Sequence, residues 1–150
     1  MDSAEYFLDT NVFLRAIVKD HPKQSVACQE ILRLLRDGSI AAVTSSVVLA
    51  EIVWTADSYY ALEKSVIADT MEGIASVRAL RIDDRVDALR AVEYFRAYNI
   101  KFVDALIAAH PRVQAGAMSV VSYDKDFDKL QVRRIEPLDL LDHYARHQQK

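Results

Sequence analysis

The sequence has few of the residues that cross-link a chain or give it sharp turns, with one cysteine, three glycines and three prolines among 150 residues. A single cysteine, Cys28, allows no internal disulfide and no thiolate zinc site, so we expect it to be a small core residue. Three glycines provide no glycine-rich phosphate loop, which excludes nucleotide-dependent kinases and dinucleotide-binding enzymes of the Rossmann type.

Long apolar runs are also missing. No stretch approaches the roughly 18 apolar residues that span a bilayer, so no membrane segment is predicted. Residues 1–5 are acidic and do not resemble the basic start of a secretory signal, and a cytoplasmic location is therefore expected. With 51% hydrophobic and 27% charged residues, the composition is that of a soluble globular protein. We expect one domain over 1–150 with a polar tail at about 144–150.

The net charge of −3 at first argues against a nucleic-acid partner. Residues 1–75 hold 6 Lys/Arg against 11 Asp/Glu, whereas residues 76–150 hold 13 against 11. A cation bound by some of the acids would offset their charge. The basic excess of the second half is thus compatible with an anionic ligand, although solvated helix faces have the same composition.

Strand-like and helix-like patterns alternate along the whole chain. Strands are expected to end near Leu8, Thr44, Ile82, Tyr123 and Ile135, and amphipathic helical segments lie between them. Thr10 or Asn11 is expected to cap the first helix, one helix is predicted over 59–73, and Asp83 or Asp84 is expected to open another. This alternation predicts an α/β fold, a three-layer α/β/α sandwich with a mainly parallel central sheet of about five strands.

Four carboxylates occupy positions that need an explanation. Asp9 and Asp124 follow apolar strands, where parallel sheets place their ligands. Glu51 and Asp104 lie in apolar helical surroundings, where a charged group is costly unless it is paired or bound to a metal. Three of them also have a simpler interpretation: Asp9 as a cap or turn residue, Glu51 as a partly exposed side chain, and Asp104 as a helix cap.

All four acids can converge at the carboxyl edge of such a sheet, provided that the strands before Asp9 and Asp124 are neighbours. Clustered carboxylates repel one another unless a cation neutralises them. An all-oxygen set without cysteine or a histidine pair favours Mg²⁺ or Mn²⁺ over zinc. The four histidines are interpreted as incidental (His21, His110, His143, His147). A hard divalent ion polarises phosphoryl oxygens and activates water, so phosphodiester hydrolysis is the expected chemistry.

Two other motifs can be tested on the sequence. Asp124, Asp126 and Asp128 have the spacing of an EF-hand start, but Lys129 and Ile135 replace the required glycine and glutamate. A phosphatase of the haloacid dehalogenase type needs a second acid two residues after the first, where this chain has Asn11. The first motif fails, and the second lacks its general acid.

Four segments together resemble the signature segments of PIN-domain ribonucleases, and more narrowly the toxins of VapBC-type toxin–antitoxin pairs. The segments are 7–13 around Asp9, 45–53 around Glu51, 102–108 around Asp104 and 122–127 around Asp124. The resemblance extends from residue 6 to about 130. Each segment is weak by itself, whereas four in this order are specific.

The resemblance implies a PIN-like fold and an endoribonuclease that uses Mg²⁺ or Mn²⁺ to activate a water molecule. It assigns Asp9, Glu51, Asp104 and Asp124 as catalytic, with Asp9, Asp104 and Asp124 holding the metal and Glu51 acting directly or through water. Supporting positions are Asn11, Ser122 and Asp126, and Asp128 has no assigned role. The resemblance further implies a homodimer, a cognate antitoxin and a structured RNA substrate such as tRNA or rRNA.

Two other functions remain open from the sequence. One is a catalytically silent PIN-like module that binds RNA or protein, and the other is a phosphohydrolase acting on small phosphoesters. The aromatic segment from Trp54 to Leu62 is a candidate surface for a partner or second subunit, with core packing as the alternative.

Overall fold

The computed structural model describes residues 6–150, and the acidic start at 1–5 lies outside this range. Five short strands form one sheet in the order β3-β2-β1-β4-β5, and each neighbouring pair is parallel. The strands are β1 (Tyr6–Leu8), β2 (Ala42–Thr44), β3 (Leu80–Ile82), β4 (Ser119–Val121) and β5 (Arg134–Ile135). The prediction of a mainly parallel sheet of about five strands is confirmed.

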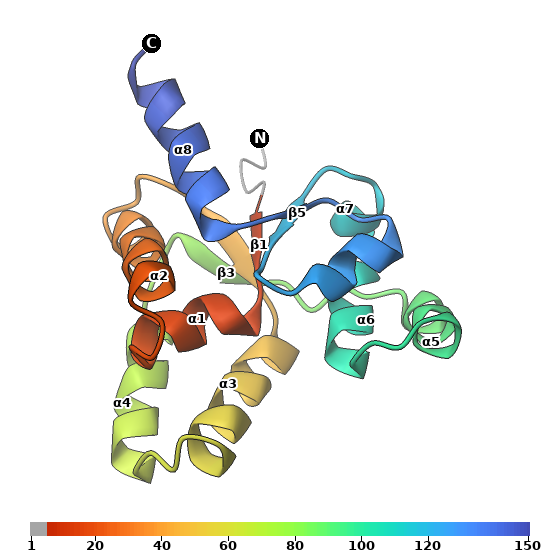
Figure 1. Cartoon of the computed structure of the whole chain (residues 1–150), viewed down its shortest axis with the longest axis horizontal. Coiled ribbons are helices and arrows are strands. Elements are labelled where there is room, and N and C mark those ends of the chain that lie inside the picture. Colours follow the sequence, from red (N-terminus) through yellow and green to blue (C-terminus); the bar gives the residue numbers. More distant parts are fainter. Residues whose placement is uncertain (1–5) are drawn as a thin grey trace.

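Helices cover both faces of the sheet and complete the three layers (Figure 1). One group of mutually packed helices contains α1 (Thr10–Ile17), α2 (Pro22–Arg36), α3 (Ser46–Ser58), α4 (Lys64–Ala75) and α8 (Pro137–Gln148). The other contains α5 (Ala88–Ala97), α6 (Phe102–Ala108) and α7 (Pro111–Gln114). Parallel strands require such crossovers and are buried on both faces, which explains the short, uninterrupted apolar strands.

The order of the strands creates a switch point between β1 and β4. The chain runs outward from β1 to β2 and β3, then returns past β1 to form β4 and β5. Ligands of open α/β sheets bind where connections diverge in this way, beyond the carboxyl ends of the strands. Leu8 pairs with Val121 in register, so the next residues, Asp9 and Ser122, emerge side by side from the sheet.

The core lies between the sheet and its helices. Phe7, Phe13 and Phe127 are the largest fully buried side chains and come from three different parts of the sequence. Cys28 is fully buried among them, as predicted. None of the helices in residues 6–150 is both long enough and apolar enough to cross a membrane.

Three local predictions are wrong. The residue that caps α1 is Asp9, not Thr10 or Asn11, because its side chain accepts a hydrogen bond from the Thr10 N–H. The helix predicted from residue 59 begins at Lys64, after a turn in which Ala61 has a left-handed backbone (φ 51°). The helix predicted from Asp83 or Asp84 begins at Ala88 with Asp87 as its cap. Helix α8 extends to Gln148 and so includes most of the polar tail expected at about 144–150.

His110 is not incidental either. Its side chain is buried, its Nδ1 accepts the Arg112 backbone N–H, and its Nε2 lies 3.1 Å from an oxygen of Asp83. The ring therefore joins the loop after β3 to the start of α7, which explains why Asp83 does not open a helix.

Candidate active site

Ser122 is the centre of a hydrogen-bond network at the switch point. Its hydroxyl donates to Asp9 Oδ2 at 2.6 Å and accepts the backbone N–H of Asp124 at 2.9 Å. Asn11 Nδ2 lies 3.1 Å from the same hydroxyl and 3.3 Å from Asp9 Oδ2. The two polar positions that the resemblance implied as supports thus contact the first predicted acid directly.

A second set of carboxylates lies where this network meets α6. Oxygens of Asp104, Asp124 and Asp126 all fall within 4.8 Å of one another. Asp124 caps the 3-10 helix η1 (Lys125–Leu130) by accepting the Asp126 N–H at 2.9 Å, and this tight turn brings Asp126 back towards Asp124. Asp126 also pairs with Lys129 at 2.7 Å.

Burial makes this region unfavourable for negative charge. Desolvation raises the pKa of Asp9 to about 6, against hydrogen bonds from Ser122 and Thr10 that favour its ionised form. Desolvation, reinforced by repulsion from Asp9 and Asp124, raises the pKa of Asp104 to about 8. One oxygen of Asp104, Oδ2, is buried and has no hydrogen-bond partner among the described residues.

Glu51 and Lys101 face the same region from different helices. Glu51 is half-buried on α3 and close enough to repel Asp9. Lys101 stands at the start of α6, three residues before Asp104, and caps no backbone group there. Partial burial lowers the pKa of Lys101, but attraction to Asp104, Glu51, Asp9 and Asp124 outweighs this, and the pKa lies above its usual value. Lys101 is thus a cation within an otherwise acidic site.

The structure therefore brings the predicted acids to one edge of the sheet. They do not all lie equally close to one another. Asp104 and Asp124 belong to the closest set, and its third member is Asp126. Asp9 adjoins this set, with both oxygens already accepting hydrogen bonds, and Glu51 is coupled to Asp9 through charge. Asp128, which had no assigned role, pairs with Arg134.

Lys101 is a site residue that the sequence pattern does not single out, because it lies in a break between two helices. Its spacing from Asp104 could have indicated it, because residues three apart lie on the same side of a helix.

The donor set fits a hard divalent cation. Three carboxylates within reach of one another provide only oxygen ligands, which suit Mg²⁺ or Mn²⁺. The buried Asp104 Oδ2 has no partner, and a bound cation would satisfy it. A cation would also relieve the repulsion that raises the pKa of Asp104.

Comparisons with known proteins agree with the fold. The structure is similar to a chain of VapBC2 from Rickettsia felis, solved bound to a DNA fragment from their promoter, with a TM-score of 0.60 and 22% identity. The similarity covers 87% of this chain and 97% of that one. No curated protein gives a significant match. The family model of the PIN domain matches residues 6–132, most of the sequence and all of the acids described above. The chain belongs to the PIN-domain family.

Proposed function

We propose that this protein is a metal-dependent endoribonuclease that hydrolyses RNA phosphodiester bonds. The observation that carries the proposal is the buried, unpartnered Oδ2 of Asp104 within a group of three mutually close carboxylates. Uncompensated acids of this kind are costly to the fold, and a bound cation offsets the cost. PIN-domain membership and the likeness to a VapBC complex support a nuclease of the toxin type.

Asp104 and Asp124 would hold the cation, with Asp9 or Asp126 beside them. A divalent ion bound there would polarise a phosphoryl oxygen and lower the pKa of a water molecule. Ser122 and Asn11 orient Asp9 through hydrogen bonds to its Oδ2. Glu51 faces Asp9 across the site and would act directly or through water. Lys101 supplies a positive charge that suits the phosphate of a bound RNA.

The test is RNA cleavage by the purified protein. Cleavage with Mg²⁺ or Mn²⁺ that stops with a chelator, and is lost in Asp9→Asn and Asp104→Asn, supports the proposal. Wild-type rates in both variants would refute the assignment of these acids. Chelator-sensitive RNA binding without cleavage would instead indicate a silent module, and turnover of nitrophenyl phosphate a small-molecule phosphohydrolase.

We further propose that the protein is a cytoplasmic toxin, that it forms a homodimer, and that a cognate antitoxin binds and inhibits it. The neighbour's own description as a VapBC complex supports a partner of this kind. Trp54 and Tyr59 are 68% and 77% exposed. They are therefore not core residues, and exposed aromatic side chains of this kind are common at partner surfaces. Co-purification with the product of an adjacent small reading frame would support the pairing. A monomer at high concentration would contradict the dimer.

A further inference from the structure

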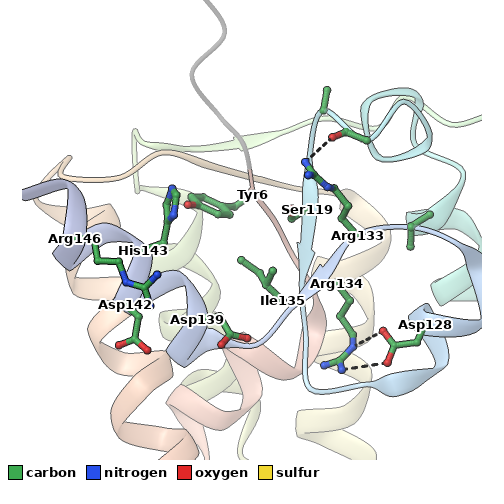
Figure 2. A pocket seen from close by; sticks show the side chains of 13 residues that line it. Tyr6, Ser119, Asp128, Arg133, Arg134, Ile135, Asp139, Asp142, His143 and Arg146 are labelled. Atoms are coloured by element: carbon green, nitrogen blue, oxygen red, sulfur yellow. Dashed lines mark hydrogen bonds and ion pairs between the residues drawn. The ribbon is translucent and has the colours of Figure 1, made fainter.

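Arg134, the first residue of β5, contacts the acidic site through the backbone carbonyl of Ser122. Its side chain is only 12% exposed, although arginine is rarely buried without partners. Its guanidinium makes four hydrogen bonds: to both oxygens of Asp128 at 2.9 and 3.2 Å, to the Ser122 carbonyl at 3.0 Å, and to Glu136 at 3.3 Å. Figure 2 shows the two-pronged contact with Asp128. The side chain is therefore held in one orientation from three sides.

Through these bonds β5 fixes the backbone of Ser122 on both sides. The Ser122 N–H donates to the Ile135 carbonyl at 3.0 Å, while its own carbonyl accepts from Arg134. Strand β4 ends at Val121, one residue earlier. The Arg134 side chain thus holds the carbonyl of Ser122, one residue beyond the end of β4, and the hydroxyl of the same residue binds Asp9 and the Asp124 N–H.

The contact of Arg134 with Asp128 holds the far end of the segment that contains Asp124 and Asp126. Asp128 lies on η1, two residues after Asp126, and its own side chain is 55% exposed. Arg134 therefore joins Ser122 to Asp128, and Asp124 and Asp126 lie between these two anchored points. A paired guanidinium with few remaining conformations suits this task better than a lysine ammonium.

We propose that Arg134 is a positioning residue for the metal centre, acting through Ser122 and Asp128 rather than by contact with metal or RNA. The inference rests on the proposed function, because it requires a cation at Asp104, Asp124 and Asp126. It predicts the direction in which cation affinity changes when Arg134 is replaced. Removing a positive charge near an acidic site should strengthen cation binding by Coulomb's law, whereas losing a positioning contact should weaken it.

The test is Mn²⁺ affinity of the full chain, measured by calorimetry and by the paramagnetic signal of free Mn²⁺. Arg134→Met should weaken Mn²⁺ binding by about 10- to 100-fold, the usual effect of losing a residue that orients ligands. Arg134→Lys should lie between wild type and Arg134→Met, because it keeps the charge but not the two-pronged contact. The matched control is Arg133→Met, which removes the same charge from the neighbouring residue, whose guanidinium binds the Gly116 carbonyl (Figure 2).

Asp128→Asn provides a second route should Arg134→Met fail to fold. It breaks the ion pair but leaves the Arg134 contact with Ser122, and we expect a several-fold weaker affinity. Because the loss of one carboxylate charge also weakens cation binding, the decisive result for this variant is an unchanged affinity, which would contradict positioning through Asp128. Melting temperatures with chelator separate positioning from stability, because a purely structural residue lowers the melting temperature without changing affinity in the folded protein.

Unchanged or tighter Mn²⁺ binding in folded Arg134→Met, or in Asp128→Asn, would overturn the inference while leaving the nuclease proposal intact. Weakening by Arg133→Met to the same degree would overturn it also. A wild-type protein that binds no Mn²⁺ and cuts no RNA would instead reject the proposed function.

Discussion

Ser122 donates its hydroxyl proton to Asp9 at 2.6 Å, although the two residues are 113 positions apart in the sequence. The bond crosses the boundary between β1 and β4, the two strands at the switch point of the sheet. It favours ionised Asp9 within a region whose burial acts in the opposite direction. One hydroxyl therefore links Asp9, between β1 and α1, to the segment after β4 that contains Asp124.

Replacing this hydroxyl should affect chemistry more than folding. Ser122→Ala removes the donor to Asp9 and the acceptor for the Asp124 N–H. We expect RNA cleavage to fall by about 10- to 100-fold, the usual cost of losing a group that orients metal ligands. The free energy of unfolding should fall by about 1–2 kcal/mol, the usual cost of an unsatisfied buried group. Ser119→Ala, at the other end of β4, is the control, and equal cleavage by both variants would contradict the role of Ser122.

Asp104→Asn should stabilise the metal-free protein while abolishing cleavage. The pKa of Asp104 is raised to about 8 from its ordinary value of 3.8, so the folded state binds more protons than the unfolded state between these values. The free energy of unfolding of the metal-free wild type should therefore decrease as pH rises through this window. At about pH 8 the variant, which has no charge to bury, should be more stable by about 1–3 kcal/mol.

Chemical denaturation with chelator at about pH 5 and about pH 8 measures this difference. Wild type should lose more stability between the two pH values than Asp104→Asn does. Added Mn²⁺ should stabilise wild type, by about 2.7 kcal/mol at a hundredfold excess over Kd, and should not stabilise the variant. Identical pH dependence of stability in wild type and Asp104→Asn would contradict the conclusion that burial disfavours the ionised carboxylate of Asp104.

Lys101→Met should strengthen cation binding. Lys101 attracts Asp104, Glu51, Asp9 and Asp124, so an incoming cation must compete with its charge. Removing it should lower the Kd for Mn²⁺ by several-fold, within the range expected for a partly exposed charge. RNA affinity should fall at the same time, because a phosphate-facing cation is lost. Lys64→Met, at the start of α4, controls for the change in net charge, and unchanged Mn²⁺ affinity in Lys101→Met would contradict the effect.

Asp83→Asn should lower the free energy of unfolding and leave the affinity for Mn²⁺ unchanged. Hydrogen bonds from Arg85, together with His110, hold the pKa of Asp83 below its usual range despite partial burial. A lowered pKa stabilises the fold above the unfolded value of about 4, and this contribution is lost as pH falls. We expect a loss of about 1–2 kcal/mol at neutral pH, measured by denaturation. A change in Mn²⁺ affinity would show that the loop after β3 is coupled to the metal centre.

The sheet and the position of the site could be predicted because both depend on local patterns. Apolar strands followed at once by acids, at Asp9 and Asp124, indicated the carboxyl edge of a parallel sheet. The order of strands decided that these two acids meet, and that order is not readable from strand patterns alone.

The errors arise where tertiary contacts override local signals. Asp83 and Asp84 looked like helix caps, but Asp83 binds Arg85 and lies beside His110, while Asp84 accepts bonds from Ser46. The late start of α4 depends on Ala61 in a left-handed conformation, which alanine rarely adopts and its sequence does not signal. The closeness of Asp126 to Asp124 depends on a 3-10 turn, which has no strong sequence pattern.

The arrangement of the strands also sets the order in which the parts of the site are assembled. Asp9, Glu51 and Asp104 are synthesised before β4 and β5, and Ser122, Asp124 and Arg134 follow them in the chain. Because pairing between distant segments forms late in folding, a nascent chain carries acids without a metal centre. Such an order of assembly would delay cation binding until the segment from Ser122 to Arg134 has been synthesised and has paired with β1.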